Sequence, residues 1–466
     1  MMAAASEVQS VHLTPDERTA IGREARAAVS RADLASHERA ADRRDPVDIL
    51  VEQGVARQQD LLPIRYGRMS LSPFAFLRGA AAVMAADLAG SPITKLRVQA
   101  IGDAHLSNFG IVATPERRLV FDVNDFDETL PGPWEWDVKR LVASVMVAAQ
   151  DNGADRATAT AAARRAARSY RTSMRGFAAD KTLDIWYAHA DMDIWIRTQS
   201  RRSRLAQNKK MLETARSRGS LQVVGKLAEQ VDGELRFKTL PPLVTPLRDL
   251  FDGDEADRVR DMIRRGFAGY RKSLAPEVRL LLDRFQGVDM ARKVVGVGSV
   301  GTRCLIALFL GRDGDDPLVL QLKEANASVL EPYAGRSVHR HHGARVVHGQ
   351  RLVQVASDVF LGWCTLEQEG QHYYWRQLKD MKGSIEVGLL DAKGFDKYVD
   401  GCAWCLARAH ARSGDPLAIA AYLGSGAAFD KALAAFAAAY ADQTKQDWKA
   451  LKAAIADGRL EALAGV

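Results

Sequence analysis

The sequence predicts an α+β protein with two lobes, a larger helical lobe and a smaller lobe built on an antiparallel sheet. Two observations predict this organisation. At 466 residues the chain is longer than a single ordinary hydrophobic core requires. Its texture also changes sharply near residue 290, where Ala- and Arg-rich stretches of helical periodicity give way to apolar and β-branched runs separated by glycine-containing turns.

The part of the chain before this change is mostly helical. Residues 1–60 form a charged, Ala-rich N-terminal helical segment, which we expect to begin at an N-cap, Thr14, directly before a proline. Within 61–285, strand-like pieces occur up to about residue 130 and surround a helix at 76–88. Residues 137–180 have the composition of one or two long helices, so helices dominate this part.

Residues 286–385 are expected to form the sheet. Two apolar runs between 292 and 323 are separated by a turn rich in Gly and Asp, which predicts an antiparallel sheet of two or three strands. A helix at 342–357 and another strand at 373–378 follow. Residues 386–466 are helical again, and we expect them to complete the larger lobe.

Composition indicates a soluble protein. The chain is 47% hydrophobic and 26% charged, and Lys and Arg (65) exceed Asp and Glu (58) to give a net charge of +7. This charge favours an anionic ligand such as a nucleotide, whereas the dispersed basic residues do not predict nucleic-acid binding. No apolar stretch approaches the roughly 18 residues of a membrane span and no signal pattern opens the chain, so we expect a cytoplasmic protein with no membrane partner.

The four cysteines suit a reducing compartment, because they are too few for a disulfide framework. Cys402 and Cys405 have the spacing of a redox motif. They lie, however, inside an apparent helix rather than after a strand. We therefore predict that both are buried structural residues.

The most informative motif is the stretch GDAHLSNFG at 102–110, followed by DVNDFDE at 122–128. An Asp and an Asn five positions apart, Asp103 and Asn108, followed by clustered carboxylates, are the layout that kinase-type phosphoryl transfer uses. We therefore predict Asp103 as the catalytic base. The candidate magnesium ligands are Asn108, Asp125, Asp122 and Asp127.

The residues between these two motifs predict a β-hairpin. They form two short apolar runs around a turn that contains a proline. Both motifs then lie at the open end of the hairpin, where their side chains can converge. This expected convergence is the reason for treating the two motifs as one site.

A second motif, GVGSVG at 296–301, has the GxGxxG spacing, in which the absent side chains let backbone N–H groups approach phosphate oxygens. A dinucleotide-binding fold needs a helix directly after the glycines, whereas an apolar strand follows here. The next strand ends at Lys323, and a kinase carries its phosphate-gripping lysine on its third strand. The predicted nucleotide contacts are Gly296, Gly298, Ser299, Gly301, Lys323, Gln377 and Leu378. Arg65, Arg68 and Arg78 could also face phosphate.

The order of the motifs is reversed relative to an ordinary kinase. There the glycine loop and lysine precede the catalytic loop, whereas here they follow it by nearly two hundred residues. A circular permutation is the economical explanation. It assigns 61–285 to a catalytic-loop lobe with a helical insertion, 286–385 to a nucleotide-lid lobe, and 386–466 to helices that complete the larger lobe.

Several phrases together resemble a bacterial family known as domain-of-unknown-function family 2252: GDAHLSNFG, FDVNDFDETLPGPWEWDVKRL, GVGSVGTR with QLKEA, YWRQLKDMKGS and LARAHARSGD. The resemblance covers about residues 45–450 and implies no activity by itself. The loop is also similar to that of aminoglycoside and choline phosphotransferases. This likeness implies a catalytic role for Asp103, metal binding by Asn108 and Asp125, and a buried bracing role for Asp137. The chain departs from that pattern at Ile101, where those enzymes often place a histidine.

Three functions remain open at this stage. The first is an ATP- and Mg²⁺-dependent phosphotransferase that acts on an unidentified small-molecule or protein hydroxyl acceptor, with nucleotidyl transfer as a variant. The second is a metal-dependent phosphoesterase, in which Asp103 and His105 would hold metal, with further ligands from Asn108, Asp122, Asp125 and the group His339, His341 and His342. The third is a nucleotide-binding regulatory module without turnover. Only the first uses the Asp/Asn loop, the acidic segment, the glycine loop and Lys323 together.

Overall fold

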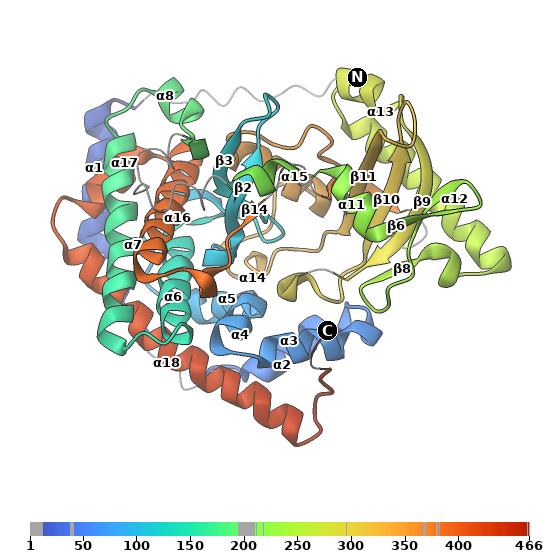
Figure 1. Cartoon of the computed structure of the whole chain (residues 1–466). Coiled ribbons are helices and arrows are strands. Elements are labelled where there is room, and N and C mark those ends of the chain that lie inside the picture. The colour runs from blue at the N-terminus through green and yellow to red at the C-terminus, as the bar shows by residue number, and fades with distance from the viewer. Residues whose placement is uncertain are drawn as a thin grey trace.

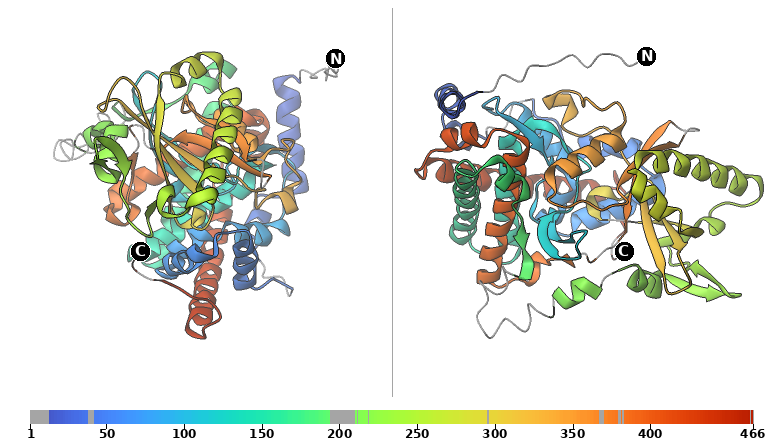
Figure 2. Two further views of the ribbon diagram at one scale, coloured as in Figure 1. Left: turned by 90° about the vertical axis from the view of Figure 1, so that its right-hand side faces the viewer. Right: turned by 90° about the horizontal axis from the view of Figure 1, so that it is seen from above.

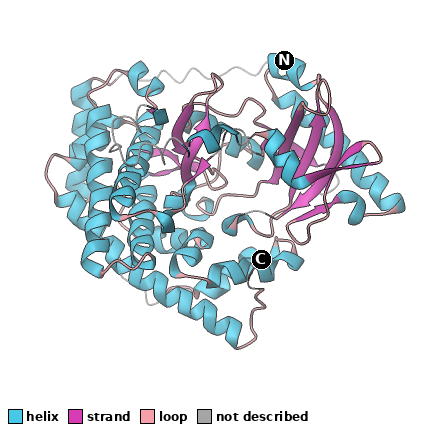
Figure 3. Ribbon diagram, viewed as in Figure 1, coloured by secondary structure: helices cyan, strands magenta, loops and turns pink. Residues whose placement is uncertain are grey.

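The protein is an α+β structure with several antiparallel sheets. Figures 1 and 3 show most of the helices gathered on one side of the molecule, the largest sheet on the other, and a smaller group of strands between them. Figure 2 shows the same separation from above. The computed structural model describes residues 13–37, 42–193, 210, 212–217, 219–294, 296–366, 370–378, 381, 383–463 and 465.

The core of the helical side centres on α6 (Trp134–Asp151), in which every residue from Trp134 to Ala149 is buried. The fully buried indole of Trp134 stacks on Tyr170 with 5.8 Å between ring centroids. A helix buried on all sides must find internal partners for its charged side chains. The helices that surround it are α7 (Arg156–Phe177), α16 (Ala392–Ser413), α17 (Pro416–Leu423) and α18 (Ala428–Ala456).

The first N-terminal helix starts where the sequence predicts. Thr14 caps the first helix and forms a capping box with Glu17, which confirms the predicted N-cap. The helix predicted at 76–88 is instead two helices, because the backbone leaves the helical conformation at Ala80 (φ −112°, ψ 36°). The five helices are α1 (Pro15–Ala28), α2 (Pro46–Val55), α3 (Leu62–Ser70), α4 (Pro73–Gly79) and α5 (Ala81–Ala89). In Figure 1, α2 to α5 lie along the lower edge, where α18 contacts α2, α3 and α4.

The predicted hairpin is confirmed. Its strands pair antiparallel from Phe109 with Val123 to Ala113 with Leu119. They lie inside a four-stranded sheet of the order β14-β2-β3-β5, and β1 pairs separately with β4. The bounds are β1 (Arg97–Ala100), β2 (Phe109–Ala113), β3 (Leu119–Val123), β4 (Leu130–Pro133), β5 (Ala190–Asp191) and β14 (Gly383–Ser384).

The largest sheet is antiparallel throughout and has the order β12-β13-β11-β10-β9-β8. The strands predicted within 292–323 and at 373–378 are present, but the expected sheet of two or three strands was too small. Of the two added edge strands, β8 has three residues and pairs with a strand far along the chain, whereas β12 pairs with β13, which follows it closely in the chain. The bounds are β8 (Val244–Pro246), β9 (Gln286–Lys293), β10 (Cys304–Leu310), β11 (Pro317–Glu324), β12 (Gly362–Leu366) and β13 (Gln371–Gln377).

Both faces of this sheet are covered. Phe309 and Leu320 share one core with Tyr270, while Leu308 and Val319 share another with Val223. Strand residues alternate between faces, so neighbouring positions enter different cores. The covering elements are α11 (Ser220–Leu227), β6 (Ala228–Val231), β7 (Glu234–Phe237), α12 (Gly253–Ser273) and α13 (Pro276–Leu282).

The covering elements alter the predicted division of the chain. The contacts of α11 with β11, of α12 with β12, and of β8 with β9 place part of 61–285 on the large sheet. The structure thus brings residues before the predicted boundary at 286 into the sheet unit. Two further helices, α14 (Glu331–Ala334) and α15 (His342–Val353), follow β11, and α15 packs on β12 and β13.

Two further expectations concern the cysteines and membrane-spanning helices. All four cysteines are buried and unpaired, and Cys402 and Cys405 lie within α16, as predicted for structural residues. In the part of the chain that the structure describes, no helix combines the length and apolar content that crossing a membrane requires.

Candidate functional site

The predicted site residues meet around one small cavity of about 140 Å³. It is bounded by the catalytic loop (102–108), the acidic segment (124–128), the glycine loop (296–301) and β11. Some of these parts are distant in the chain: Lys323 and Asp127 are in contact although 196 positions separate them. The lining residues are Gln53, Arg57, Arg78, Gly79, Ala81, Ile101, Asp103, His105, Asn108, Asp125, Asp127, Glu128, Gly296, Val297, Gly298, Ser299, Lys323 and Arg376.

The catalytic loop connects β1 to β2 and is held by Asp137 from the first turn of α6. The two carboxylate oxygens of Asp137 accept hydrogen bonds from the backbone N–H groups of Ile101 at 2.6 Å and Gly102 at 2.9 Å. Gly102 has φ +83°, and a Cβ there would lie 2.4 Å from the carbonyl oxygen of Glu128. Glycine is therefore required at this turn. Asp137 occupies the bracing position that the phosphotransferase resemblance implies.

A histidine that sequence analysis missed supports Asp137 from behind. His410 of α16 lies with Nε2 3.1 Å from Asp137 Oδ2, and its Nδ1 lies 2.8 Å from the hydroxyl of Tyr170. Because a carboxylate only accepts, Nε2 donates to Asp137. Ile101 itself is a buried apolar residue. An imidazole from a different helix thus supports the bracing carboxylate, and the quoted phrase LARAHARSGD contains it.

Asp103 lies in the cavity wall next to Arg140 of α6. Its Oδ1 accepts from Arg140 Nε at 2.8 Å, and Arg140 Nη2 lies 2.7 Å from the same oxygen. Burial raises the pKa of Asp103 to about 6, although Arg140 acts in the opposite direction. The carboxyl group is therefore poised to exchange a proton near neutral pH.

The backbone N–H of His105 donates to the carbonyl of Asp103 at 2.8 Å, but the two side chains form no hydrogen bond. The imidazole Nε2 lies 3.6 Å from Asp103 Oδ2, beyond hydrogen-bond distance. Burial, reinforced by Arg78 and Arg140, lowers the pKa of His105 well below its ordinary value. The imidazole is therefore neutral beside the catalytic loop.

Antiparallel pairing brings Asn108 to the acidic segment, as the hairpin predicted. Asn108 precedes the first residue of β2, and its carbonyl accepts from the N–H of Asn124 at 2.8 Å. The side-chain Nδ2 of Asn108 donates to the carbonyl of Asp103 at 2.6 Å. This bond turns the amide oxygen of Asn108 away from the loop backbone, which leaves it as the group that can meet a cation.

Asp127 joins three parts of the site. It forms an ion pair with Lys323 of β11, accepts from Ser299 Oγ of the glycine loop at 3.1 Å, and accepts from the Tyr374 hydroxyl at 2.7 Å. Burial opposes ionisation of Asp127, but Lys323 and these hydrogen bonds lower its pKa to about 2. Burial would also lower the pKa of Lys323, whereas Asp125 and Asp127 raise it well above its ordinary value. Asp127 is therefore engaged by protein groups in this structure.

Asp125 is less engaged than Asp127. Its side chain is 33% exposed, and its Oδ2 lies 3.9 Å from Lys323 Nζ. Asp125 Oδ1 accepts from the N–H of Asp127 at 3.3 Å. Of these two aspartates, Asp125 offers the more accessible carboxylate to a metal.

The glycine loop is only partly the predicted nucleotide contact. Gly296, Gly298 and Ser299 line the cavity, whereas Gly301 does not. Gly301 has φ +88°, and a Cβ there would lie 3.0 Å from the side chain of Arg57. Gly301 is thus explained by the turn and by its close contact with Arg57.

The structure corrects the prediction that Asp122 holds metal. Asp122 is fully buried on β3, outside the cavity lining. It forms an ion pair with Arg408 of α16 at 2.5 Å and accepts from the N–H of Val355 at 3.0 Å. A carboxylate committed to these partners is structural, because a metal ligand must face the site.

Two predicted nucleotide contacts also lie outside the cavity. The N–H of Gln377 donates to Asp358, and that of Leu378 donates to Val319 at 3.0 Å. Gln377 is the last residue of β13, and Leu378 follows it beside β11. Their backbone groups are used by protein partners, so the structure gives them a role in the sheet rather than in the cavity wall.

Several lining residues were not predicted. Glu128 and Arg376 belong to phrases that sequence analysis quoted, so motif membership was their signal. Gln53 lies in α2, and Arg57 lies just beyond the end of that helix. No local sequence pattern marked either residue. Burial raises the pKa of Glu128 to about 7, which makes it a second proton-exchanging group in the wall.

The three arginines proposed as phosphate contacts differ in their placement. Arg78 lines the cavity, whereas Arg65 and Arg68 do not. Arg65 is fully buried and donates to Gln53 and to the carbonyl of Gly79. Arg78 is therefore the one of the three that the structure presents to a ligand.

The described residues contain no group of three or more His, Cys, Asp or Glu side chains that could hold a metal by themselves. His341 caps α15 through Nδ1, which accepts from the N–H of Ala344, and its ring stacks on His372. His339, His341 and His342 are not part of the cavity lining. These three histidines therefore lie apart from Asp103 and His105, with which the phosphoesterase hypothesis groups them.

Comparison with known proteins shows the family to which the chain belongs. The family model described as "Uncharacterized protein conserved in bacteria (DUF2252)" matches residues 57–454. The resemblance found from the motifs to that family is confirmed. No curated protein and no solved structure matches the chain.

Proposed function

This chain belongs to that bacterial family, and we propose that it is a kinase-like phosphotransferase that uses Mg·ATP and a hydroxyl acceptor. One observation carries the proposal: Asp103, Asn108, Asp125, the glycine loop and Lys323 line the same cavity although the two groups of residues lie far apart in the chain. Phosphoryl transfer needs these groups together, because its catalysis consists of positioning and charge stabilisation.

The sheet around the glycine loop supports the proposal. Counted from β9, the strands lie side by side in the order first, second, third, fifth and fourth, and α15 connects the third to the fourth. The glycine loop joins the first two strands, and Lys323 lies on the third, as in protein kinases. A circular permutation explains why this unit follows the catalytic loop in the chain.

Asp103 is the proposed base. As the acceptor oxygen forms its bond to phosphorus and the bond to the leaving nucleotide breaks, Asp103 takes the hydroxyl proton. Arg140 and the bond from Asn108 to its carbonyl fix Asp103 in the wall, and Asp137 fixes the loop backbone. Orientation of this kind accounts for much of the rate in reactions of this class.

The described residues fit Mg·ATP. Mg²⁺ is usually held by one or two carboxylates together with phosphates and water, so a complete protein cage is not expected. Asn108 and Asp125 would hold the ion, and Lys323 with the backbone of Gly296 and Gly298 would hold phosphate oxygens. Mg·ATP supplies the phosphoryl group and neutralises its charge.

The cavity must enlarge for this function. Ligand pockets usually measure about 300–1,000 Å³, well above the cavity found here. The bond from Ser299 to Asp127 and the ion pair of Lys323 with Asp127 close the glycine loop on the acidic segment. We propose that phosphate oxygens replace Asp127 as partners of Ser299 and Lys323, so that the loop opens.

A nucleotide-binding module without turnover is the second candidate. In active kinases the lysine pairs with a glutamate of the helix after the third strand, and α15 contains no acidic residue. Arg345 of α15 instead donates to the carbonyl of Asp127 at 2.7 Å. Binding of Mg·ATP without consumption in the presence of any acceptor would favour this candidate.

Mg·ATP should raise the melting temperature, because a ligand that binds only the folded state stabilises it by mass action, by about 2.7 kcal/mol at one hundred times the dissociation constant. Lys323→Met should reduce this shift and Asp125→Asn should remove its dependence on magnesium. Differential scanning fluorimetry with and without EDTA measures both effects. An equal shift of the unmodified protein without divalent metal would contradict the role of Asp125.

The rate of transfer should rise with pH through about 6, since Asp103 accepts a proton only when ionised. Below that pH the rate should fall about tenfold per unit. Arg140→Gln removes a charge that lowers the pKa of Asp103, so the acidic limb should move to higher pH, whereas Arg140→Lys should keep it nearer its original position. The pH profile of kcat/KM measures this, and an unmoved limb in Arg140→Gln would exclude Asp103 as the titrating group.

A further inference from the structure

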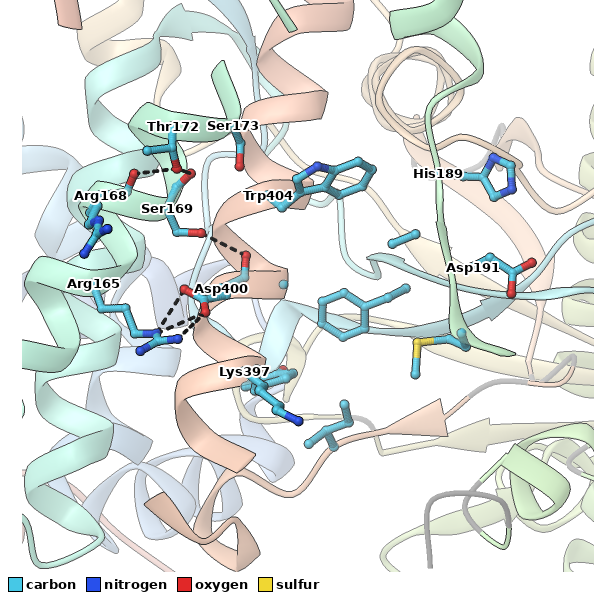
Figure 4. Close-up of a pocket in the computed structure, with 16 residues that line it drawn as sticks. Arg165, Arg168, Ser169, Thr172, Ser173, His189, Asp191, Lys397, Asp400 and Trp404 are labelled. Carbon is cyan, nitrogen blue, oxygen red and sulfur yellow. Dashed lines mark hydrogen bonds and ion pairs between the residues drawn. The ribbon is translucent and has the colours of Figure 1, made fainter. Parts of the chain in front are cut away.

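A second cavity, of about 810 Å³, lies beside α16 and shares no lining residue with the first. It is bounded by α7, α16, β3 and the segment 189–192. Its volume falls within the range of sites that enclose small molecules. Figure 4 shows Trp404 on one side of this space, Lys397 on another, and His189 and Asp191 across from α16.

The middle of the cavity wall is apolar. Phe121, Met192, Ile385 and Trp404 contribute to it. Gly401 of α16 keeps the wall open, because a Cβ there would lie only 3.3 Å from the ring of Phe121. Aromatic and aliphatic walls of this kind bind the apolar body of a ligand.

The charged groups around the cavity favour an anion. Its lining contains three cationic side chains, Arg165, Arg168 and Lys397, and two carboxylates, Asp191 and Asp400. Both carboxylates are engaged by arginines: Asp400 accepts from Arg165 at 2.6 Å, and Asp191 forms an ion pair with Arg118. Figure 4 shows the ion pair of Arg165 with Asp400 and the ammonium group of Lys397 extending beneath Trp404.

We propose that this cavity binds an amphipathic small-molecule acid, with an apolar or aromatic body against Phe121 and Trp404 and an anionic group at Lys397. The inference rests on the shape, apolar wall and excess positive charge of the cavity. It is independent of the proposed phosphotransferase activity, since the two cavities have no lining residue in common.

The site also touches the catalytic loop through one side chain. Tyr398 lines the cavity, and its hydroxyl lies 2.6 Å from the carbonyl of Leu106 and 3.0 Å from that of Phe109. Its ring meets Phe121 edge to face at 5.6 Å. A bound acid would therefore contact the residues that hold the end of the catalytic loop.

Anilinonaphthalene sulfonate and dodecanoate are suitable probes, because each joins an apolar body to one anionic group. We expect one site per chain for the sulfonate by fluorescence titration, and displacement of the sulfonate by dodecanoate. The neutral analogue N-phenylnaphthylamine should bind more weakly. Equal affinity for the neutral and anionic probes would overturn the assignment of an acid.

Two variants locate the site. Lys397→Glu should weaken sulfonate binding about tenfold or more, the loss expected when a charge-assisted contact is removed, and Gly401→Leu should fill the cavity and abolish binding. Lys393→Glu is the matched control, since Lys393 is exposed one turn earlier on α16 and is not in the lining. If Gly401→Leu does not fold, Lys397→Glu decides alone. Binding that is equal in Lys397→Glu and Lys393→Glu would overturn the proposal.

Discussion

Asp103→Asn is expected to lower the rate of phosphoryl transfer by about 10²–10⁴-fold, because removal of a general base commonly costs that much. The amide keeps the size of the side chain and its contact with Arg140, so the catalytic loop should remain in place. Binding of Mg·ATP should persist, since the groups proposed to hold it are Asn108, Asp125 and Lys323. A transfer assay with labelled ATP and a broad set of hydroxyl acceptors, paired with a thermal shift, measures both properties.

His105→Gln is the matched control for this variant. His105 lines the same cavity, and its imidazole lies near the carboxylate of Asp103 without a hydrogen bond to it. We expect its loss to affect transfer much less than the loss of Asp103. Full turnover in Asp103→Asn, with loss of turnover and of metal binding in the His105 variant, would instead favour metal-dependent hydrolysis.

Asp122→Ala is expected to destabilise the protein by about 3–5 kcal/mol, because removing one partner of a buried ion pair leaves the other charge uncompensated. The side chains of Asp122 and Arg408 are each only 1% exposed. A large loss of stability would show that Asp122 has a structural role, unlike the proposed metal ligands Asn108 and Asp125. Urea unfolding of the variant and the unmodified protein measures the difference.

The surface pair of Arg156 with Asp442 provides the control. Its side chains are 60% and 52% exposed, so water screens their attraction. Asp442→Ala should therefore cost a small fraction of the effect of Asp122→Ala. If Asp122→Ala unfolds no more easily than Asp442→Ala but loses the magnesium-dependent thermal shift, Asp122 would return as a metal ligand.

Much of the site could be predicted because its parts are encoded locally. The hairpin follows from two apolar runs around a turn, and antiparallel pairing of Phe109 with Val123 then brings Asn108 to the acidic segment without any help from distant residues. The same holds for the two strands that flank the glycine loop and for the strand that ends at Lys323. These strands are neighbours in the sequence, so local patterns predict them. The helices of 137–180 follow from their composition, so the α+β class could also be predicted.

The roles of individual carboxylates could not be predicted in this way. Asp122, Asp125 and Asp127 lie within six positions of one another in the same motif, and sequence pattern ranked them only by likeness to known loops. In the structure Asp122 meets Arg408, Asp127 meets Lys323, and Asp125 remains partly exposed. Each of these outcomes depends on which helix or strand packs against that side chain.

The sequence alone therefore determined many of the elements, among them the hairpin and the strand that ends at Lys323, and the convergence at the hairpin ends. The tertiary structure decided which charges are paired, that His410 supports Asp137, and that Gln377 and Leu378 belong to the sheet. The physical reason is that helices, turns and hairpins form through contacts between near neighbours. Burial and charge pairing instead depend on packing between segments as far apart as Asp127 and Lys323, 196 positions along the chain.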